Sequence, residues 1–112
     1  MFGPYPLTSA SIRKHVLAKP GAYVLFTNKN EPIYCGRSDT DLNAQVQKHF
    51  SGAETNECIK VKIVSKFSYQ NTAGPKEAYE LECTNFHQYN PTCNDKHPEK
   101  NEAVWICPVC KS

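Results

Sequence analysis

The 112-residue sequence lacks the segments that would direct a protein to a membrane or out of the cell. Its first residues contain no basic stretch followed by an apolar run, which excludes the pattern of a signal peptide. No apolar run is long enough to span a bilayer, and internal repeats and low-complexity segments are absent. We therefore expect a cytoplasmic protein of one domain, with a modest core that a structural metal would help to stabilise.

The sequence also lacks a strong charge of either sign. Its net charge is +2, so bulk charge alone does not predict a nucleic-acid partner. The first 50 residues nevertheless carry a surplus of three positive charges, and the remainder sums to minus one. Arginine is scarce, since only Arg13 and Arg37 occur. A mild basic bias therefore accompanies the first half of the chain.

Periodicity and turn signals predict a small α/β (α+β) fold, with helices flanking a three-stranded, mixed or antiparallel sheet. The expected elements are helices over 8–19, from Ser38 to about Phe50 and from Gly74 to about Asn90, and strands over 23–27, 33–35 and 58–68. Ser38 and Asp41 have the spacing of a capping box. Between 58 and 68, isoleucine and valine alternate with lysine, as in a strand with one dry and one basic face.

Two triplets lie at the hairpin that the first two strands form. Gly21-Ala22-Tyr23 leads into the first strand, and Tyr34-Cys35-Gly36 ends the second. We expect the two tyrosines to lie on a common face. A single tyrosine in a strand usually packs in a core. A pair of tyrosines beside a carboxylate is suited to acid–base chemistry, so the hairpin is the candidate catalytic element.

The order of these triplets and of the residues that follow resembles the GIY-YIG nuclease superfamily. The further matching residues are Leu42, His49-Phe50, and Glu82 followed by Pro91 and Asn94 at offsets of nine and twelve residues. The resemblance covers about residues 19–94. It implies a nuclease domain over 1–94, including the N-terminal helix, and a metal-dependent endonuclease that hydrolyses phosphodiester bonds of DNA.

The resemblance also implies a role for each matching side chain. Glu82 would hold the catalytic Mg²⁺ or Mn²⁺, which neutralises charge on the phosphoryl oxygens. Tyr23 would act as the general base, with Tyr34 positioned beside it. The remaining expected site residues are Arg37 as a phosphate ligand, His49 lining the site and Asn94 fixing the loop after the third helix.

One position departs from the family pattern. Where the family has an arginine three residues after Leu42, this sequence has Gln45. Glutamine keeps a hydrogen-bond donor but loses the charge and the planar fork of arginine. By analogy with arginines in phosphoryl transfer, such a loss costs on the order of 10³-fold in rate. The chain is therefore an inactivated variant, a natural module that binds nucleic acid without cleaving it, or an enzyme in which Arg37 or Lys48 supplies the charge.

The six cysteines are expected to be reduced, because no export signal is present. We expect Cys35 and Cys58 to lie in strands as small buried hydrophobes. Near the end of the sequence, Cys107-Pro108-Val109-Cys110 is a CxxC turn typical of a zinc knuckle.

A tetrahedral zinc site requires two ligands besides Cys107 and Cys110. Cys83 and His87 lie one helical turn apart and are the expected pair. Cys93 and His97 have the same spacing but follow Pro91, where the helix should have ended. A structural zinc would then staple the tail, residues 95–112, onto the domain.

Three functions are compatible with these patterns. They are a divalent-metal-dependent endonuclease, a catalytically inactive nucleic-acid-binding module of the same fold, and a small zinc-bound interaction domain. The expected partner is DNA, with branched or damaged DNA as a candidate substrate, and no membrane is expected. No separate DNA-reading domain is present, so specificity would come from loops, a protein partner or an oligomer.

Overall fold

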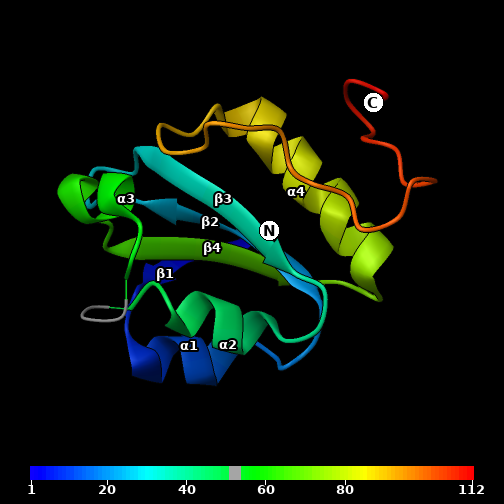
Figure 1. Cartoon of the computed structure of the whole chain (residues 1–112). Coiled ribbons are helices and arrows are strands. Elements are labelled where there is room, and N and C mark those ends of the chain that lie inside the picture. Colours follow the sequence, from blue (N-terminus) through cyan, green and yellow to red (C-terminus); the bar gives the residue numbers. More distant parts are fainter. Residues whose placement is uncertain (51–53) are drawn as a thin grey trace.

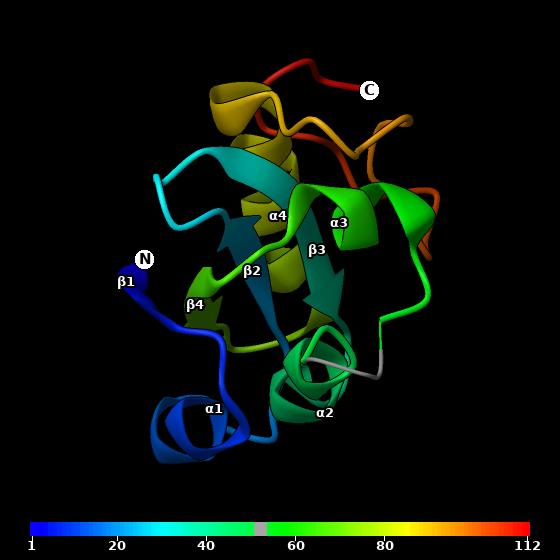
Figure 2. The same cartoon turned by 90° about the vertical axis from the view of Figure 1, so that its left-hand side faces the viewer.

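The computed structural model describes residues 1–50 and 54–112. The chain order of the elements is β1 (Phe2–Pro6), α1 (Ser9–His15), β2 (Gly21–Phe26), β3 (Pro32–Ser38), α2 (Leu42–Gln47), α3 (Glu57–Lys62), β4 (Lys66–Asn71) and α4 (Pro75–Tyr89). The strands form one antiparallel sheet in the order β1-β4-β2-β3. Helix α4 covers one face of this sheet, and α1 and α2 lie on the other (Figures 1 and 2).

Strand β2 is buried along its whole length because both faces of the sheet are covered. Its alternate side chains enter different cores. Tyr23 and Leu25 pack with residues of α1 and α2, whereas Val24 and Phe26 pack toward α4 with Phe86. Tyr23 therefore points to the same side of the sheet as α2, which places its hydroxyl within reach of that helix.

The predicted mixed α/β fold is confirmed, but the sheet has four strands where three were expected. The additional strand, β1, contains Pro4 and Pro6, which argue against a strand in the sequence. It is an edge strand that pairs only with β4, and an edge tolerates proline because one row of its backbone groups needs no partner.

The prediction of a strand over 58–68 is wrong. The segment instead forms helix α3, a left-handed turn at Ile63 (φ 56°) and the beginning of β4. Asn56 begins the helix because its side-chain oxygen accepts a hydrogen bond from the Ile59 N–H. Of the alternating apolar residues, Ile59 is buried, whereas Val61 and Ile63 are exposed, so their period does not mark a buried face.

The boundaries of helices α1 and α2 differ less from the predicted ones. Helix α1 is shorter than expected and has Thr8 as its N-cap, and α2 begins at Leu42 with Asp41 as its N-cap. Ser38 belongs to β3, and its hydroxyl accepts hydrogen bonds from the N–H groups of Thr40 and Asp41 rather than capping a helix. Helix α4 runs as predicted, with Pro75 in its first turn and Asn90 as its left-handed C-cap.

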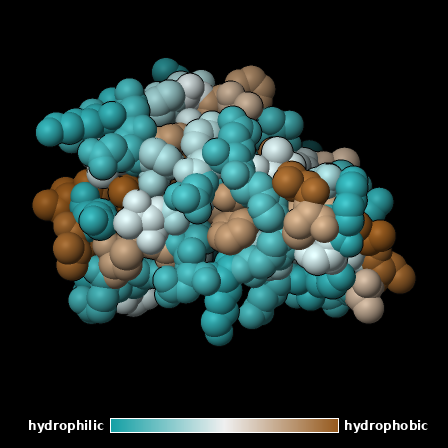
Figure 3. Space-filling model, turned by 90° about the horizontal axis from the view of Figure 1, so that it is seen from above, coloured by the Kyte–Doolittle hydropathy of each residue, from teal (hydrophilic) through white to brown (hydrophobic). Residues whose placement is uncertain are grey.

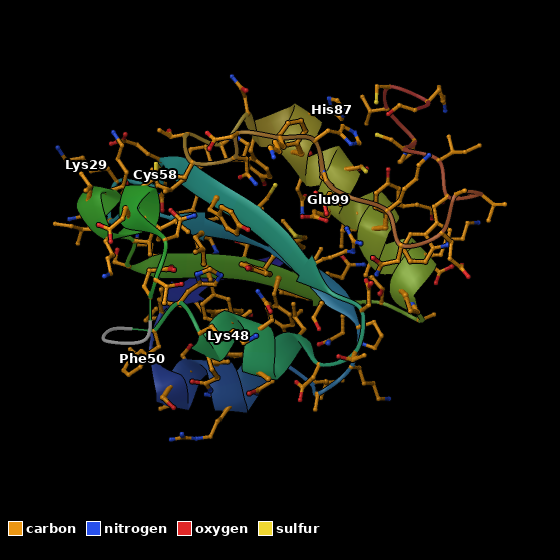
Figure 4. All side chains as sticks on the ribbon, in the orientation of Figure 1. Lys29, Lys48, Phe50, Cys58, His87 and Glu99 are labelled. Atoms are coloured by element: carbon orange, nitrogen blue, oxygen red, sulfur yellow. A yellow bond between two sulfur atoms is a disulfide. The ribbon has the colours of Figure 1, made fainter. Side chains whose placement is uncertain are left out.

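The expectation that Cys58 is a reduced residue in a strand is wrong. Cys58 lies in α3 and forms a disulfide with Cys93, in the loop after α4 (Figure 4). Cys35 is a free, buried thiol in β3, as expected. The disulfide joins two segments that are 35 residues apart in sequence, which periodicity cannot reveal.

After α4 the chain turns back and runs along the helix (Figure 1). Trp105 and Cys107 of this tail pack against Tyr79 and Cys83 of α4. The face of the molecule seen in Figure 3 is mainly hydrophilic, with apolar areas at its ends and no broad apolar patch across it. Among the described residues, no helix combines the length and the apolar character needed to cross a membrane.

Candidate active site

A cleft of about 290 Å³ opens where β2, β3, α2, α4 and the tail meet. Its lining residues are Tyr23, Tyr34, Gly36, Arg37, Asp39, Gln45, Glu82, Glu99 and Asn101. The rings of the two tyrosines are 6.3 Å apart between centroids. The structure thus brings five of the seven sequence-predicted catalytic residues into one cleft, and His49 and Asn94 lie behind its wall as described below.

The glycines of the two triplets are explained by close packing. A Cβ atom on Gly36 would lie 2.5 Å from the Tyr23 hydroxyl, because these two residues face each other across β2 and β3. A Cβ atom on Gly21 would lie 2.5 Å from the carbonyl oxygen of Gln70 in β4. The hydroxyl of Tyr23 therefore lies directly against the backbone of the second triplet, and only glycine leaves room for it.

Replacement of Gly36 by alanine is expected to displace the Tyr23 ring. Overpacking of this kind costs roughly 1–3 kcal/mol of stability, and displacement of a reacting group by about 1 Å can lower a rate about 100-fold. Cleavage rate and melting temperature of Gly36→Ala measure both effects. Gly74→Ala is the matched control, since its Cβ would meet only the flexible end of Glu77. Equal cleavage by both variants would contradict this explanation of Gly36.

Tyr23 forms the floor of the cleft and is fully buried. Its hydroxyl is 2.6 Å from Nε2 of His49, and the amide of Gln45 donates to it at 3.4 Å. Burial raises the pKa of Tyr23 well above its usual value, and the neighbouring Tyr34 raises it further. The phenol is therefore protonated near neutral pH and needs a proton acceptor or a cation before it can act as a base.

Glu82 of α4 is buried and paired with a cation. Arg37 donates from Nη1 to Oε1 of Glu82 at 2.6 Å and from Nε to Oδ1 of Asp39 at 2.8 Å. The guanidinium also lies over the rings of Tyr79 and Trp105, at 5.2 and 5.9 Å from their centroids. Arg37 is thus held between two carboxylates and two aromatic rings.

The pKa values of this pair reflect its burial. Burial raises the pKa of the Glu82 carboxyl, and the lowering effect of the Arg37 guanidinium does not cancel it. Burial alone would lower the pKa of Arg37, but its hydrogen bonds to Asp39 and Glu82 outweigh that effect and raise it. The cleft therefore contains a permanent cation beside a carboxylate that its surroundings make less acidic than usual.

Gln45 lies on α2 and lines the cleft beside Tyr23, at the position where the family pattern has arginine. Two other cations were possible replacements. Lys48 is exposed at the end of α2 and is not among the lining residues. Arg37 is the one cation among the described residues that line the cleft.

Asn94 joins the loop after α4 to the second triplet. Its side-chain oxygen accepts from the Cys35 N–H at 2.8 Å, and its amide donates to the Cys35 carbonyl at 3.0 Å. The amide thereby occupies both backbone groups of a residue in β3, as a neighbouring strand would. It holds the backbone between Tyr34 and Gly36 in place without lining the cleft.

Sequence reasoning missed three lining residues, Asp39, Glu99 and Asn101. Glu99 (Figure 4) and Asn101 reach the cleft from the tail that runs along α4, and the amide of Asn101 donates to Asp39. Asp39 follows Arg37 by two residues, in a turn at the end of β3. This pair of opposite charges was the one sequence signal that could have placed Asp39 near the site. No sequence signal pointed to the two tail residues.

A second group of side chains could hold a metal ion. The ligand atoms of His87, His97, Cys107 and Cys110 all lie within 4.8 Å of one another. His97 takes the place that was expected for Cys83. The Nδ1–H of His97 donates to the Pro98 carbonyl at 2.9 Å, which leaves Nε2 free to bind a metal, 3.4 Å from Sγ of Cys110.

The protonation of the thiols agrees with this arrangement. Burial raises the pKa of Cys83 to about 12, so it remains a thiol. Burial also acts against ionisation of Cys107, but N–H groups of Cys110 and Val109 and the ring of His97 outweigh it and lower its pKa to about 5. Metals bind the thiolate, so Cys107 is prepared as a ligand and Cys83 is a core residue beside it.

Comparison with known proteins identifies relatives that match about three quarters of this chain. UvrABC system protein C from Clostridium botulinum, strains Hall and Langeland, is 34% identical in an alignment 92 residues long that covers 75% of this chain and 15% of that protein. The chain therefore spans only about 15% of the length of these relatives. No family model matches the sequence.

Solved structures show the same fold. The GIY-YIG N-terminal endonuclease domain of UvrC from Thermotoga maritima, bound to magnesium as its catalytic divalent cation, superposes with a TM-score of 0.60 at 25% identity and covers 75% of this chain and 96% of that domain. A point mutant of that domain, bound to its catalytic divalent cation, has a TM-score of 0.61 at 24% identity and covers 77% and 97%. These similarities confirm the resemblance seen in the sequence, and the chain belongs to the GIY-YIG superfamily.

Proposed function

We propose that this chain is a Mg²⁺- or Mn²⁺-dependent endonuclease that hydrolyses phosphodiester bonds of DNA. One observation carries the proposal: Tyr23, Tyr34 and Glu82, from three different elements, line the same cleft. The similar domain from T. maritima is an endonuclease domain that binds its catalytic magnesium. Specificity for branched, damaged or other DNA would come from the loops, a protein partner or an oligomer.

Glu82 is suited to a hard divalent cation. Its Oε1 accepts from Arg37, and within the described part of the chain its Oε2 has no hydrogen-bond partner. Mg²⁺ keeps several waters and takes substrate oxygens, so a single protein carboxylate is enough to hold it. When bound, the cation would neutralise negative charge that builds on the phosphoryl oxygens.

The other residues would bind and orient the substrate. Arg37 would supply the positive charge that Gln45 lacks, because it is the one cation among the described lining residues. Tyr23 would accept a proton from the attacking water, with Tyr34 orienting that water from the adjacent strand. Asn94 would keep the second triplet against Tyr23 through its two bonds to Cys35.

Nicking of supercoiled plasmid tests this function directly. The protein should produce nicked DNA with Mg²⁺ or Mn²⁺ and none with EDTA. Cruciform-bearing and ultraviolet-damaged plasmids extend the test to branched and damaged DNA. Absence of nicking on all of these with both metals would contradict the endonuclease proposal.

Gln45 supports a second candidate, a nucleic-acid-binding module without cleavage. Such a protein would bind DNA in the same assay buffer and leave it intact. Its affinity should fall steeply with salt concentration, because each phosphate contact releases counterions. A zinc-bound interaction domain, the third possibility, would neither bind nor cleave DNA.

We also propose that His87, His97, Cys107 and Cys110 bind one structural Zn²⁺. Two thiolates and two imidazoles are a common donor set for tetrahedral zinc, and the ligand atoms are close enough to meet it after a small contraction. The ion would tie the end of the chain to α4. Since Glu99 and Asn101 belong to the same tail, it would also support one wall of the cleft.

Metal analysis of the purified protein should find about one zinc per chain. At a free zinc concentration of about 1,000 times Kd, binding stabilises the folded protein by about 4 kcal/mol, so a chelator should lower the melting temperature. Cys107→Ser should lose the zinc. Cys83→Ala is the matched control and should retain it, because Cys83 lies outside the ligand group. Loss of zinc from Cys83→Ala, with retention by His97→Ala, would restore the ligand set expected from the sequence.

A further inference from the structure

Behind the cleft, three side chains form a continuous line of hydrogen bonds. The Tyr23 hydroxyl is 2.6 Å from Nε2 of His49, and Nδ1 of His49 is 2.5 Å from Oε1 of Glu54. The other oxygen of Glu54 accepts from the backbone N–H groups of Thr55 and Asn56, each at 3.0 Å. The carboxylate is therefore held in place by backbone donors at the beginning of α3.

This line is shielded from bulk solvent. Tyr23 is fully buried, and the side chains of His49 and Glu54 are 8% and 13% exposed. The titratable groups around His49 are Tyr23 of β2, Tyr34 of β3, Glu54, and Lys60 of α3 across a neighbouring cavity. Hydrogen bonds among these groups are correspondingly stronger than they would be at the surface.

The geometry sets the tautomer of His49. A carboxylate can only accept, so Nδ1 of His49 must carry the proton that is directed at Glu54. The neutral ring then has a lone pair on Nε2, and the Tyr23 hydroxyl must be the donor to it. Carboxylate, imidazole and hydroxyl thus follow one another as in the catalytic triads of hydrolases, with a phenol in place of serine.

We propose that Glu54 is a positioning residue that makes His49 the proton acceptor for Tyr23 during DNA hydrolysis. The inference rests on the proposed nuclease function. As the water oxygen bonds to phosphorus, the water proton passes to the Tyr23 oxygen and the Tyr23 proton passes to Nε2 of His49. The bond from phosphorus to the leaving oxygen breaks, and that oxygen takes a proton from solvent. Glu54 stabilises the resulting imidazolium.

Two cavities meet at this relay. Tyr23 lines the active-site cleft, whereas His49 and Glu54 line a separate cavity of about 380 Å³ beside α3. The proton that His49 receives can therefore leave on the side away from the substrate. The relay also resolves a difficulty, because a buried phenol with a raised pKa is a poor base alone but an effective one when its own proton is removed in the same step.

Nitrogen-15 NMR of histidine-labelled protein tests the positioning role without any cleavage. Four histidines are present, and His49→Ala identifies the signals of His49. In the unaltered protein, neutral His49 should carry its proton on Nδ1. Glu54→Ala should shift the ring toward the tautomer protonated on Nε2, and Glu54→Asp should restore at least part of the original signal. A wild-type ring protonated on Nε2 would overturn the proposal.

Single-turnover cleavage tests the relay itself. Glu54→Ala should lower the cleavage rate about 10- to 100-fold, which reaches the lower end of the roughly 10²- to 10⁴-fold contribution of general bases, and leave the Kd for DNA in Ca²⁺ unchanged. Glu57→Ala is the matched control, since it removes an exposed acid from the same segment. Melting temperatures show whether each variant is folded. If Glu54→Ala does not fold, Glu54→Asp replaces it in the cleavage assay.

The results separate the relay from the nuclease function. Wild-type cleavage by folded Glu54→Ala, or an equal loss in Glu57→Ala, would overturn the relay and leave the endonuclease proposal intact. A wild-type protein that fails to cleave any DNA would contradict the endonuclease proposal, and with it the proton transfer. The tautomer would then still decide whether Glu54 positions His49.

Discussion

Replacement of Glu82 by glutamine should lower metal-dependent cleavage of plasmid DNA at least about 1,000-fold, which corresponds to about 4 kcal/mol of transition-state stabilisation. Glutamine has nearly the same shape and keeps an oxygen for Arg37, but it cannot supply a negative ligand to the divalent cation. The loss should appear in the single-turnover rate. Titration with Mn²⁺ should show a matching loss of metal affinity.

The fold should survive this change. Glu82 is buried and its pKa is raised, so the ionised carboxylate is not well stabilised by its surroundings. Arg37 would retain its hydrogen bond to Asp39. Glu80→Gln on the same helix is the control, because Glu80 makes only a long surface pair with Lys76. Undiminished cleavage by folded Glu82→Gln would remove Glu82 from the proposed site.

Replacement of Gln45 by arginine should raise the cleavage rate, by up to about 1,000-fold if the rest of the site is complete. Two effects act in the same direction. The guanidinium would pair with the phosphate through its planar fork. It would also lie near the Tyr23 hydroxyl, which Gln45 already reaches at 3.4 Å, and a neighbouring cation lowers the pKa of a phenol.

Two control variants separate these effects from a change in net charge. Gln47→Arg adds the same charge to the same helix at a residue that does not line the cleft, and it should leave cleavage near the starting level. Gln45→Lys adds a point charge without the fork and should give an intermediate rate. If Gln45→Arg leaves the rate unchanged in an active protein, Arg37 already supplies the charge. If both proteins are inactive on every DNA tested, the nucleic-acid-binding function is favoured.

Parts of the fold with a strong local period could be predicted from the sequence. Helix α4 was predicted with both ends, because Pro75 marks its first turn and Pro91 follows its last residues. The hairpin of β2 and β3 was predicted from aromatic and β-branched residues around a polar turn. Between residues 57 and 68, however, an alternating pattern concealed a short helix, since Asn56 and the packing of Ile59 decided the local structure.

The site shows the same division. Tyr23, Tyr34, Arg37, Gln45 and Glu82 were predicted, and all five line the cleft. The proposed zinc ligands include three of the four residues expected from the sequence, with His97 in place of Cys83, because the tail returns along α4 and brings its histidine beside His87. Glu54, Glu99 and Asn101 carried no sequence signal, since each reaches its place from an irregular segment.

The sequence alone determined which residues carry the proposed chemistry and, for most of them, on which elements they lie. The order of the two triplets, Gln45 and Glu82 resembles the GIY-YIG pattern, and that resemblance assigned them to a common site. Only the tertiary structure decided what surrounds them: the carboxylate behind His49, the histidine that lies beside Cys107 and Cys110, and the disulfide between Cys58 and Cys93. These depend on the course of loops, which is set by caps and by packing against distant side chains rather than by any backbone period.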